Sequence, residues 1–227
     1  MDILRRKLIN TTRIKTMQIE TIVVSPFETN CYLVWSENSR DGVIIDPGDE
    51  DERILERIEK QGINPRAVLL THGHGDHIAA VDQVKKKLNI PLYIGRGDET
   101  MLGSPSANVS AMFGFQISCP PADHIISDSD VIKIGPLTFT VFATPGHSPG
   151  GVCYFAENIL FCGDTLFYGS IGRTDLPGGS FQQLIDSIDR NILTLPDDII
   201  CYPGHGPATS VGQERRNNPF LTGNKFV

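Results

Sequence analysis

The sequence AVLLTHGHGDHIAA, residues 67–80, decides the expected fold. It begins with an apolar run that is typical of a β-strand and then changes into a loop rich in glycine, histidine and aspartate. Imidazole and carboxylate groups are the ligands that suit zinc, iron and manganese. We therefore expect four side chains of this loop to face a metal site: His72, His74, Asp76 and His77.

The loop itself predicts local structure and leaves one alternative open. Gly73 and Gly75 are expected to let the backbone turn tightly, because glycine tolerates positive φ. A helix is expected to follow, from Ile78 to about Leu88. The alternative is a closed structural zinc site, but such sites are usually rich in thiolate ligands. Since residues 67–80 contain no cysteine, an open catalytic site is favoured.

The same arrangement recurs at three later places, where a short apolar strand is followed by a glycine and then by one metal-binding side chain. These places are residues 137–147, 158–164 and 198–205, which end at His147, Asp164 and His205. Four strands that deliver ligands from the same kind of end imply that these ends meet along one edge of the sheets. Five of the six histidines of the chain then belong to one site.

These motifs resemble those of the metallo-β-lactamase-fold hydrolase superfamily. Within it, the chain is most similar to the glyoxalase II-like branch, the hydroxyacylglutathione hydrolases and their short single-domain relatives. The resemblance extends over residues 17–221 and includes CGDTLF at 162–167, GRTD at 172–175, PGHG at 203–206 and NPFL at 218–221. It implies an α+β fold of the αββα sandwich type, in which two mixed sheets carry helices on both outer faces.

Seven candidate ligands are too many for one tetrahedral ion but fit two divalent ions that share a ligand. The resemblance assigns His72, His74 and His147 to the first ion, Asp76, His77 and His205 to the second, and Asp164 to a position bridging both. A carboxylate suits that position because it has two oxygens. Zinc is the expected metal, with iron or manganese as alternatives.

The resemblance implies hydrolysis of a thioester such as lactoylglutathione. Two cations would lower the pKa of a bridging water from about 15.7 towards about 7, and the resulting hydroxide would attack the carbonyl carbon. Asp76 and Asp164 are the candidate catalytic residues. Arg173 is the candidate substrate contact for a glutathione carboxylate, and a salt-bridged surface arginine is the alternative.

Other activities remain open. The branch of mononuclear iron persulfide dioxygenases shares the HxHxDH and Gly-Arg-Thr-Asp segments, and hydrolysis of a lactone or another ester is a further alternative. A non-catalytic metal-binding or scaffold protein is disfavoured by the complete ligand set. The identities of His77 and Asp164 point away from β-lactams as substrates.

The C-terminal part of the chain bears on whether the thiol part of the substrate is glutathione. Full-length glyoxalase II adds a helical domain with basic residues for glutathione, whereas only 22 residues follow His205 here. Three basic residues in this part are candidates to replace that domain: Arg215, Arg216 and Lys225. The thiol is therefore expected to be glutathione-derived only if these residues take that role.

Composition limits the partners. A chain of 227 residues, 40% hydrophobic and 21% charged, is typical of a globular protein. Its net charge of −7 argues against nucleic acid, which usually needs a basic face. No segment approaches the roughly 18 consecutive apolar residues of a membrane span. A small-molecule thioester is the expected partner, and the oligomeric state is left open.

The remaining expectations concern domains and loops. Residues 1–16 are expected to form a loosely attached tail, and residues 17–227 a single domain. The five cysteines lack C-x-x-C spacing and are expected to be reduced, in a cytoplasmic protein. Residues 95–123 are irregular and are expected to form a mobile loop or short-helix region over the site that determines specificity. His124 lies outside every ligand pattern.

Overall fold

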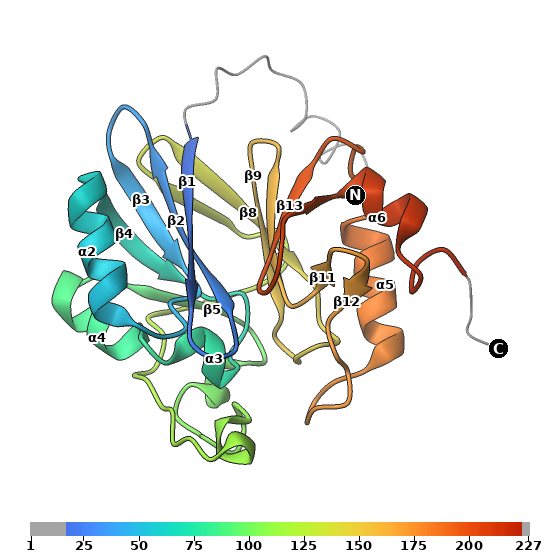
Figure 1. The fold of residues 1–227 in the computed structure, drawn as a ribbon, viewed down its shortest axis with the longest axis horizontal. Helices are drawn as coiled ribbons and strands as arrows, with labels where there is room; N and C mark the ends of the chain where they lie inside the picture. Colours follow the sequence, from blue (N-terminus) through green and yellow to red (C-terminus); the bar gives the residue numbers. More distant parts are fainter. Residues whose placement is uncertain (1–16, 224–227) are drawn as a thin grey trace.

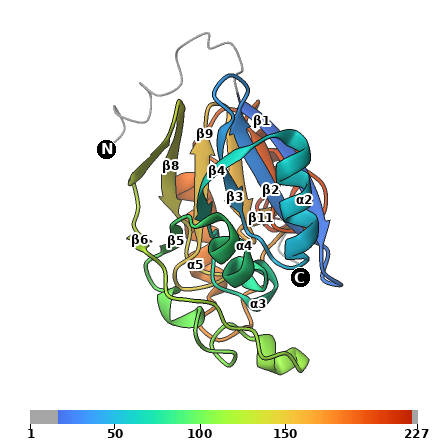
Figure 2. The same ribbon diagram turned by 90° about the vertical axis from the view of Figure 1, so that its left-hand side faces the viewer.

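Two six-stranded β-sheets pack face to face, and helices cover the outer face of each (Figure 1). The computed structural model describes residues 17–223, so the tail expected at 1–16 lies outside the described residues. The four layers confirm the predicted αββα sandwich. Figure 2 shows the same layers from the side of the first sheet.

The first sheet has the strand order β1-β2-β3-β4-β5-β6. Its strands are β1 Met17–Val24, β2 Thr29–Ser36, β3 Asp41–Ile45, β4 Asn64–Leu69, β5 Leu92–Gly95 and β6 His124–Ile126. The first three strands are antiparallel neighbours, whereas β3 to β6 run parallel to one another. Parallel strands bring their carboxyl ends to one edge, so the loops after β3 and β4 lie together.

The second sheet has the order β14-β13-β10-β9-β8-β7. Its strands are β7 Val131–Ile134, β8 Leu137–Ala143, β9 Val152–Ala156, β10 Ile159–Gly163, β13 Ile200–Pro203 and β14 Thr209–Ser210. β10 and β13 are parallel, and β8 has the same direction because β9 is antiparallel to both β8 and β10. A small hairpin, β11 Leu166–Phe167 and β12 Ser170–Ile171, follows β10.

The helices lie on the outer faces. The first sheet is covered by α2 Asp51–Gln61 and α4 Val81–Leu88, and the second by α5 Phe181–Asn191 and α6 Val211–Asn217. The shorter elements are α3 Gly75–Ile78 and the 3₁₀ turns η1 Glu99–Met101 and η2 Ser110–Phe113. The expectation of one helix over 78–88 was wrong. The N–H of Ala80 donates to the carbonyl of Pro47 at 3.0 Å, which separates α3 from α4.

β4 shows how the sequence builds the layers. Val68 and Leu70 pack into the core beneath α2 and α4, whereas Ala67 and Leu69 pack into the core between the sheets. All four are fully buried. A strand buried on both faces needs a nearly continuous apolar run, which is what precedes the histidine loop.

The cysteines and the lengths of the helices bear on two further expectations. All five cysteines are buried and unbridged, as expected of reduced thiols. Within residues 17–223, no helix combines the length and the apolar character that crossing a bilayer requires.

Candidate metal centre

One edge of the sandwich collects the polar residues that follow its strands. The loop 72–77 follows β4, and His147, Asp164 and His205 follow β8, β10 and β13. The structure thus brings all seven predicted ligands together. His124 is elsewhere, in β6, where its ring stacks on Tyr93.

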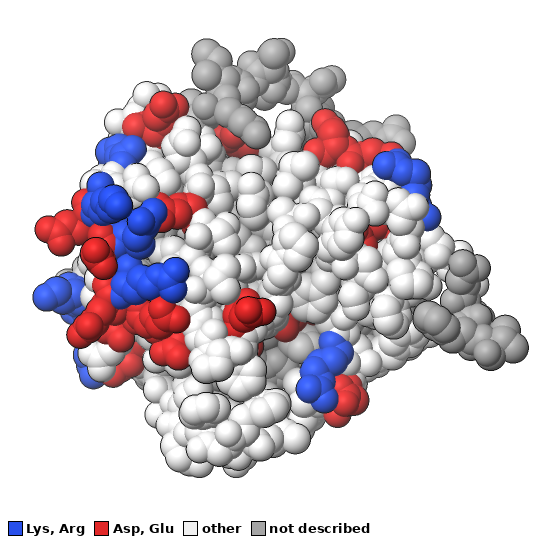
Figure 3. Space-filling model, in the orientation of Figure 1, with Lys and Arg blue, Asp and Glu red and all other residues white. Residues whose placement is uncertain are grey.

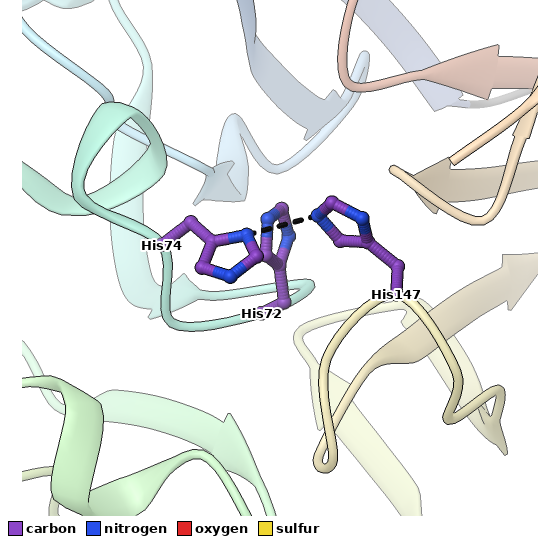
Figure 4. Close-up of side chains that lie close together, drawn as sticks. All are labelled: His72, His74 and His147. Carbon is purple, nitrogen blue, oxygen red and sulfur yellow. Dashed lines mark hydrogen bonds between the residues drawn. The ribbon is translucent and has the colours of Figure 1, made fainter. Parts of the chain in front are cut away.

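The first cluster contains His72, His74 and His147, and its rings converge in Figure 4. One ligand-capable atom from each lies within 4.8 Å of the others. The closest pair, His74 Nδ1 and His147 Nε2, is 2.9 Å apart. All three side chains are buried. This spacing suits three ligands of one ion.

The second cluster contains Asp76, His77 and His205, again with ligand atoms within 4.8 Å of one another. His205 Nε2 lies 3.2 Å from Asp76 Oδ2 and 3.3 Å from His77 Nε2. His77 is buried, whereas Asp76 and His205 are partly exposed. A second ion held here would therefore face the solvent more than one in the first cluster.

Asp164 lies between the two clusters. Its Oδ1 is 3.4 Å from His77 Nε2. Its Oδ2 is 3.5 Å from His147 Nε2 and 3.6 Å from His205 Nε2. Oδ2 therefore approaches one imidazole of each cluster, and Oδ1 approaches a second imidazole of the second cluster. The bridging role of Asp164 stays a prediction.

Backbone carbonyls orient two of the histidines. His147 Nδ1 donates to the carbonyl of Arg173 at 2.7 Å, and His205 Nδ1 donates to that of Phe27 at 2.9 Å. A carbonyl only accepts, so the proton is held on Nδ1 and the lone pair of Nε2 faces the cluster. This tautomer is the one that a metal ligand needs.

Asp46 supports the site from within the protein. This buried carboxylate accepts hydrogen bonds from Thr71 N at 2.8 Å and Thr71 Oγ1 at 2.6 Å, and it lies 3.0 Å from His77 Nδ1. With His72 and His77 it forms a third group of metal-capable atoms. Because its oxygens already have these partners, we interpret Asp46 as orienting His77. Sequence analysis missed it, although it directly follows β3 just as the ligands follow their strands.

Asp98 joins the loops that carry the first cluster. Its carboxylate accepts hydrogen bonds from Gly73 N at 3.0 Å, Ser148 Oγ at 2.7 Å and Gly150 N at 2.6 Å. Burial raises the pKa of Asp98, although the hydrogen bonds from Ser148, Gly150 and Gly73 oppose this shift. No sequence pattern marked Asp98, which lies in the irregular region 95–123.

The role expected for the loop glycines was wrong. Neither Gly73 nor Gly75 has positive φ. A Cβ on Gly73 would instead lie 2.8 Å from Met101 Cβ, and one on Gly75 would lie 2.7 Å from Ser110 Cβ. These glycines are needed because the segment around residues 101–110 packs directly against the histidine loop.

The donor atoms of the two clusters fit divalent ions. Three buried atoms, His72 Nε2, His74 Nε2 and Asp164 Oδ1, lack hydrogen-bond partners in the described part of the chain. Burial and neighbouring imidazoles lower the pKa of His72, and burial and His147 lower that of His74 to about 3. Both are therefore neutral ligands at pH 7. Burial raises the pKa of Asp164, but His77 and His147 outweigh it and keep this group ionised.

A cavity of about 410 Å³ opens over both clusters. Asn108, Val109 and Phe113 line it, so part of the region 95–123 does lie over the site. Arg173 also lines it, with an exposed side chain that forms a double hydrogen bond to Asp175, both at 2.8 Å. The salt bridge foreseen as the alternative is thus present, and the substrate-binding role of Arg173 remains a prediction.

The basic C-terminal candidates are engaged elsewhere. Arg215 donates to the carbonyls of Leu193 and Leu195, and Arg216 pairs with Asp197 at 2.7 Å. Neither lines the cavity. Lys225 lies outside the described residues.

Comparison with known proteins identifies the class. The family model of the metallo-beta-lactamase superfamily matches residues 24–205, and the chain therefore belongs to this superfamily. Probable metallo-hydrolase YqgX of Bacillus subtilis is 41% identical, over 91% of this chain and 99% of that protein. Hydroxyacylglutathione hydrolase GloC of Haemophilus influenzae is 38% identical, over 90% and 98%. The protein is a metallo-hydrolase of this family.

Solved structures agree on the fold. BLEG-1 B3 metallo-beta-lactamase is 43% identical with a TM-score of 0.88, covering 91% of this chain and all of that chain. ETHE1 from Myxococcus xanthus is 30% identical with a TM-score of 0.77, covering 91% and 85%. TTHA1623 in a di-iron-bound form is 37% identical with a TM-score of 0.79, covering 89% and 100%.

Proposed function

We propose that this protein is a metal-dependent hydrolase of thioesters of the hydroxyacylglutathione type. The observation that carries the proposal is the position of Asp164 between two clusters of imidazoles at the base of an open cavity. The similarity to GloC supports the same substrate class. In the reaction, water adds its oxygen to the acyl carbon, the carbon–sulfur bond breaks, and a proton from water ends on the thiol or the buffer.

The chain's own residues take distinct parts. Divalent ions in the two clusters would supply an acidified water and an electrophile for the carbonyl oxygen. The first cluster and Asp164 fit one ion, and the second cluster fits the other. Asp76 lies on the cavity surface, with its Oδ2 3.2 Å from His205 Nε2 and 3.4 Å from Thr29 Oγ1. From there its carboxylate can orient an attacking water.

The remaining lining residues favour a thioester over an amide. Among the described residues that line the cavity, every histidine and aspartate belongs to the clusters or to the bridging position, and the only other charged one is Arg173. No group is left to protonate a leaving nitrogen, a step typically worth about 10²–10⁴ in rate. A thiolate needs no such help, because thiol pKa values are roughly 8.5.

Oxidation of a persulfide at a single iron is the second candidate function. The likeness to ETHE1 supports it as much as the likeness to GloC supports thioester hydrolysis. The presence of iron in TTHA1623 keeps iron open for this chain as well.

One preparation can decide between the two. Protein purified without added metal is assayed for metal content, for thiol release from lactoylglutathione, and for oxygen uptake with glutathione persulfide. We expect thiol release without oxygen uptake. Oxygen uptake with a persulfide, combined with no hydrolysis of any thioester or lactone in a panel, would establish the second function instead.

A further inference from the structure

The cavity over the metal centre is built from two unlike sides. After β12, the second sheet contributes the stretch with Arg173 and Leu176. From the first sheet come the β1–β2 turn and residues 108–117. In Figure 1 the segment with η2 lies below the first sheet, and the segment after β12 lies below the second.

Three phenyl rings gather on the side of the first sheet, and we name Phe27, Phe113 and Phe115 the phenyl wall. The ring centroid of Phe27 lies 5.4 Å from that of Phe113 and 6.2 Å from that of Phe115, both edge to face. All three line the cavity, yet they are 38%, 48% and 46% exposed. Clustered apolar side chains exposed in this way typically mark a binding surface.

Two rings of the phenyl wall belong to an uncharged segment, because residues 100–122 contain no Asp, Glu, Lys or Arg. In Figure 3, charged side chains gather over the helices of the first sheet at the left, and the lower part of this face is almost free of them. Arg173 is the only cation among the described residues that line the cavity, and its guanidinium already pairs with Asp175. A substrate carboxylate would therefore have to compete with Asp175 for Arg173, whereas the phenyl wall fits an apolar group.

The segment that carries two of these rings is firmly attached to the metal-binding loop. Asn108 accepts a hydrogen bond from Gly75 N through its carbonyl at 2.9 Å, and Gly75 stands between two predicted ligands. The buried Asn108 side chain donates to the carbonyls of Met101 and Ile117. Ser110 Oγ accepts from Ile117 N at 3.2 Å, which closes the loop on itself.

Val109 adds backbone strain at the same place. Its φ of 59° is unusual for a β-branched residue, and its buried side chain lines the cavity. Such strain persists where the surrounding structure imposes it, often at ligand-binding sites. The hydrogen bonds of the segment thus attach the stretch that carries Phe113 and Phe115 to the metal-binding loop.

We propose that the phenyl wall is the acyl subsite and that it selects thioesters whose acyl group is large and apolar, with an aromatic ring as the best fit. The inference rests on the proposed thioester hydrolysis. A small polar acyl group such as lactoyl leaves the three rings in water, whereas an aromatic acyl group covers them with edge-to-face contacts.

A binding measurement tests the subsite without turnover. S-benzylglutathione and S-methylglutathione are thioethers that a hydrolase cannot cleave, and calorimetry gives the affinity for each. We expect the benzyl compound to bind roughly tenfold or more tightly, as extra apolar contacts in a pocket typically allow. The double variant Phe113→Ala/Phe115→Ala should lose this preference. Met112→Ala is the control, because Met112 is 66% exposed and does not line the cavity.

Equal affinity for the two thioethers in the native protein, or a preference that survives the double variant, would overturn the subsite. Rates of hydrolysis of S-mandeloylglutathione and S-lactoylglutathione test the acyl subsite and the proposed function independently of each other. We expect the native protein to prefer the mandeloyl ester and the double variant to hydrolyse the two esters with similar kcat/KM. Equal hydrolysis of both overturns the acyl subsite alone. Hydrolysis of neither overturns the proposed function, and thioether binding then still decides whether the phenyl wall binds an aromatic group.

Discussion

The two metal clusters lie on one edge of the sandwich but differ in how the protein encloses them. His72, His74 and His147 are at most 5% exposed. In the second cluster the side chains of Asp76 and His205 are 21% and 27% exposed. The first cluster is therefore the more enclosed of the two, although His74 and His147 also line the cavity, and the second cluster is more open to solvent.

The supporting residues differ in the same way only in part, because the buried Asp46 also supports His77 of the second cluster. Asp98 ties together the loops on which the first cluster stands. In the second cluster, His205 is oriented by the carbonyl of Phe27, in the exposed turn between β1 and β2. We infer that the ion of the first cluster is held more tightly and that the ion of the second cluster lies closer to the bond that is hydrolysed.

The largest effect is expected at the residue the clusters share. Asp164→Asn should reduce the metal content from two ions to about one per chain, because an amide bridges poorly. Activity should fall by more than the roughly 100-fold typical of residues that only support a ligand. Elemental analysis and thioester assays check both, with the exposed Asp189→Asn in α5 as the matched control. Full activity with one ion would contradict the bridging role.

A smaller effect is expected from the residue that supports the first cluster. Asp98→Asn should weaken binding of the first ion by about 10- to 100-fold. The Asp98 carboxylate accepts three hydrogen bonds, and the NH₂ group of asparagine would face one or more of these donors without being able to accept from them. Competition with a chromophoric chelator measures this affinity. Asp82→Asn, which changes an exposed pair with Lys86, is the control. An unchanged affinity in Asp98→Asn would show that the loops hold their positions without it.

Stepwise removal of metal compares how tightly the two clusters hold their ions. Dialysis against increasing concentrations of a chelator should release the ions in two steps, the second cluster first, because Asp76 and His205 are accessible to solvent. Activity should disappear with the first step. Release of both ions in one step would mean that the difference in burial has no energetic consequence.

The smallest effect is expected at the rim of the cavity. Arg173→Ala should raise KM for a glutathione thioester a few-fold with little change in kcat, because exposed ion pairs contribute only about 0–1 kcal/mol. KM for a small thioester without carboxylates should change less. Equal changes for both substrates would identify the Arg173 side chain as structural.

The ligands could be predicted because each follows an apolar strand, and strands of one direction present their ends at one edge. What the sequence did not reveal depends on contacts between distant segments. Asp98 bonds to Ser148, 50 positions away, and Asp46 bonds to Thr71, 25 positions away. The break between α3 and α4 likewise depends on the carbonyl of Pro47.

The glycine prediction failed for the same reason. Gly73 was expected to permit a local turn. Glycine is instead needed there because a Cβ would collide with Met101, which no local sequence pattern brings near. By contrast, the end of α2 is set by a local feature, because Gly62 has a φ of 61° and caps the helix.

The most direct test compares two substrates on one metal-analysed preparation, since BLEG-1, a B3 metallo-beta-lactamase, is 43% identical to this chain. The measurement is kcat/KM for an α-hydroxyacyl thioester of glutathione against kcat/KM for β-lactams. Because none of the described residues that line the cavity is left to protonate an amide nitrogen, the account predicts that the thioester is favoured by about 10²–10⁴. Efficient β-lactam turnover with little thioester hydrolysis would contradict it.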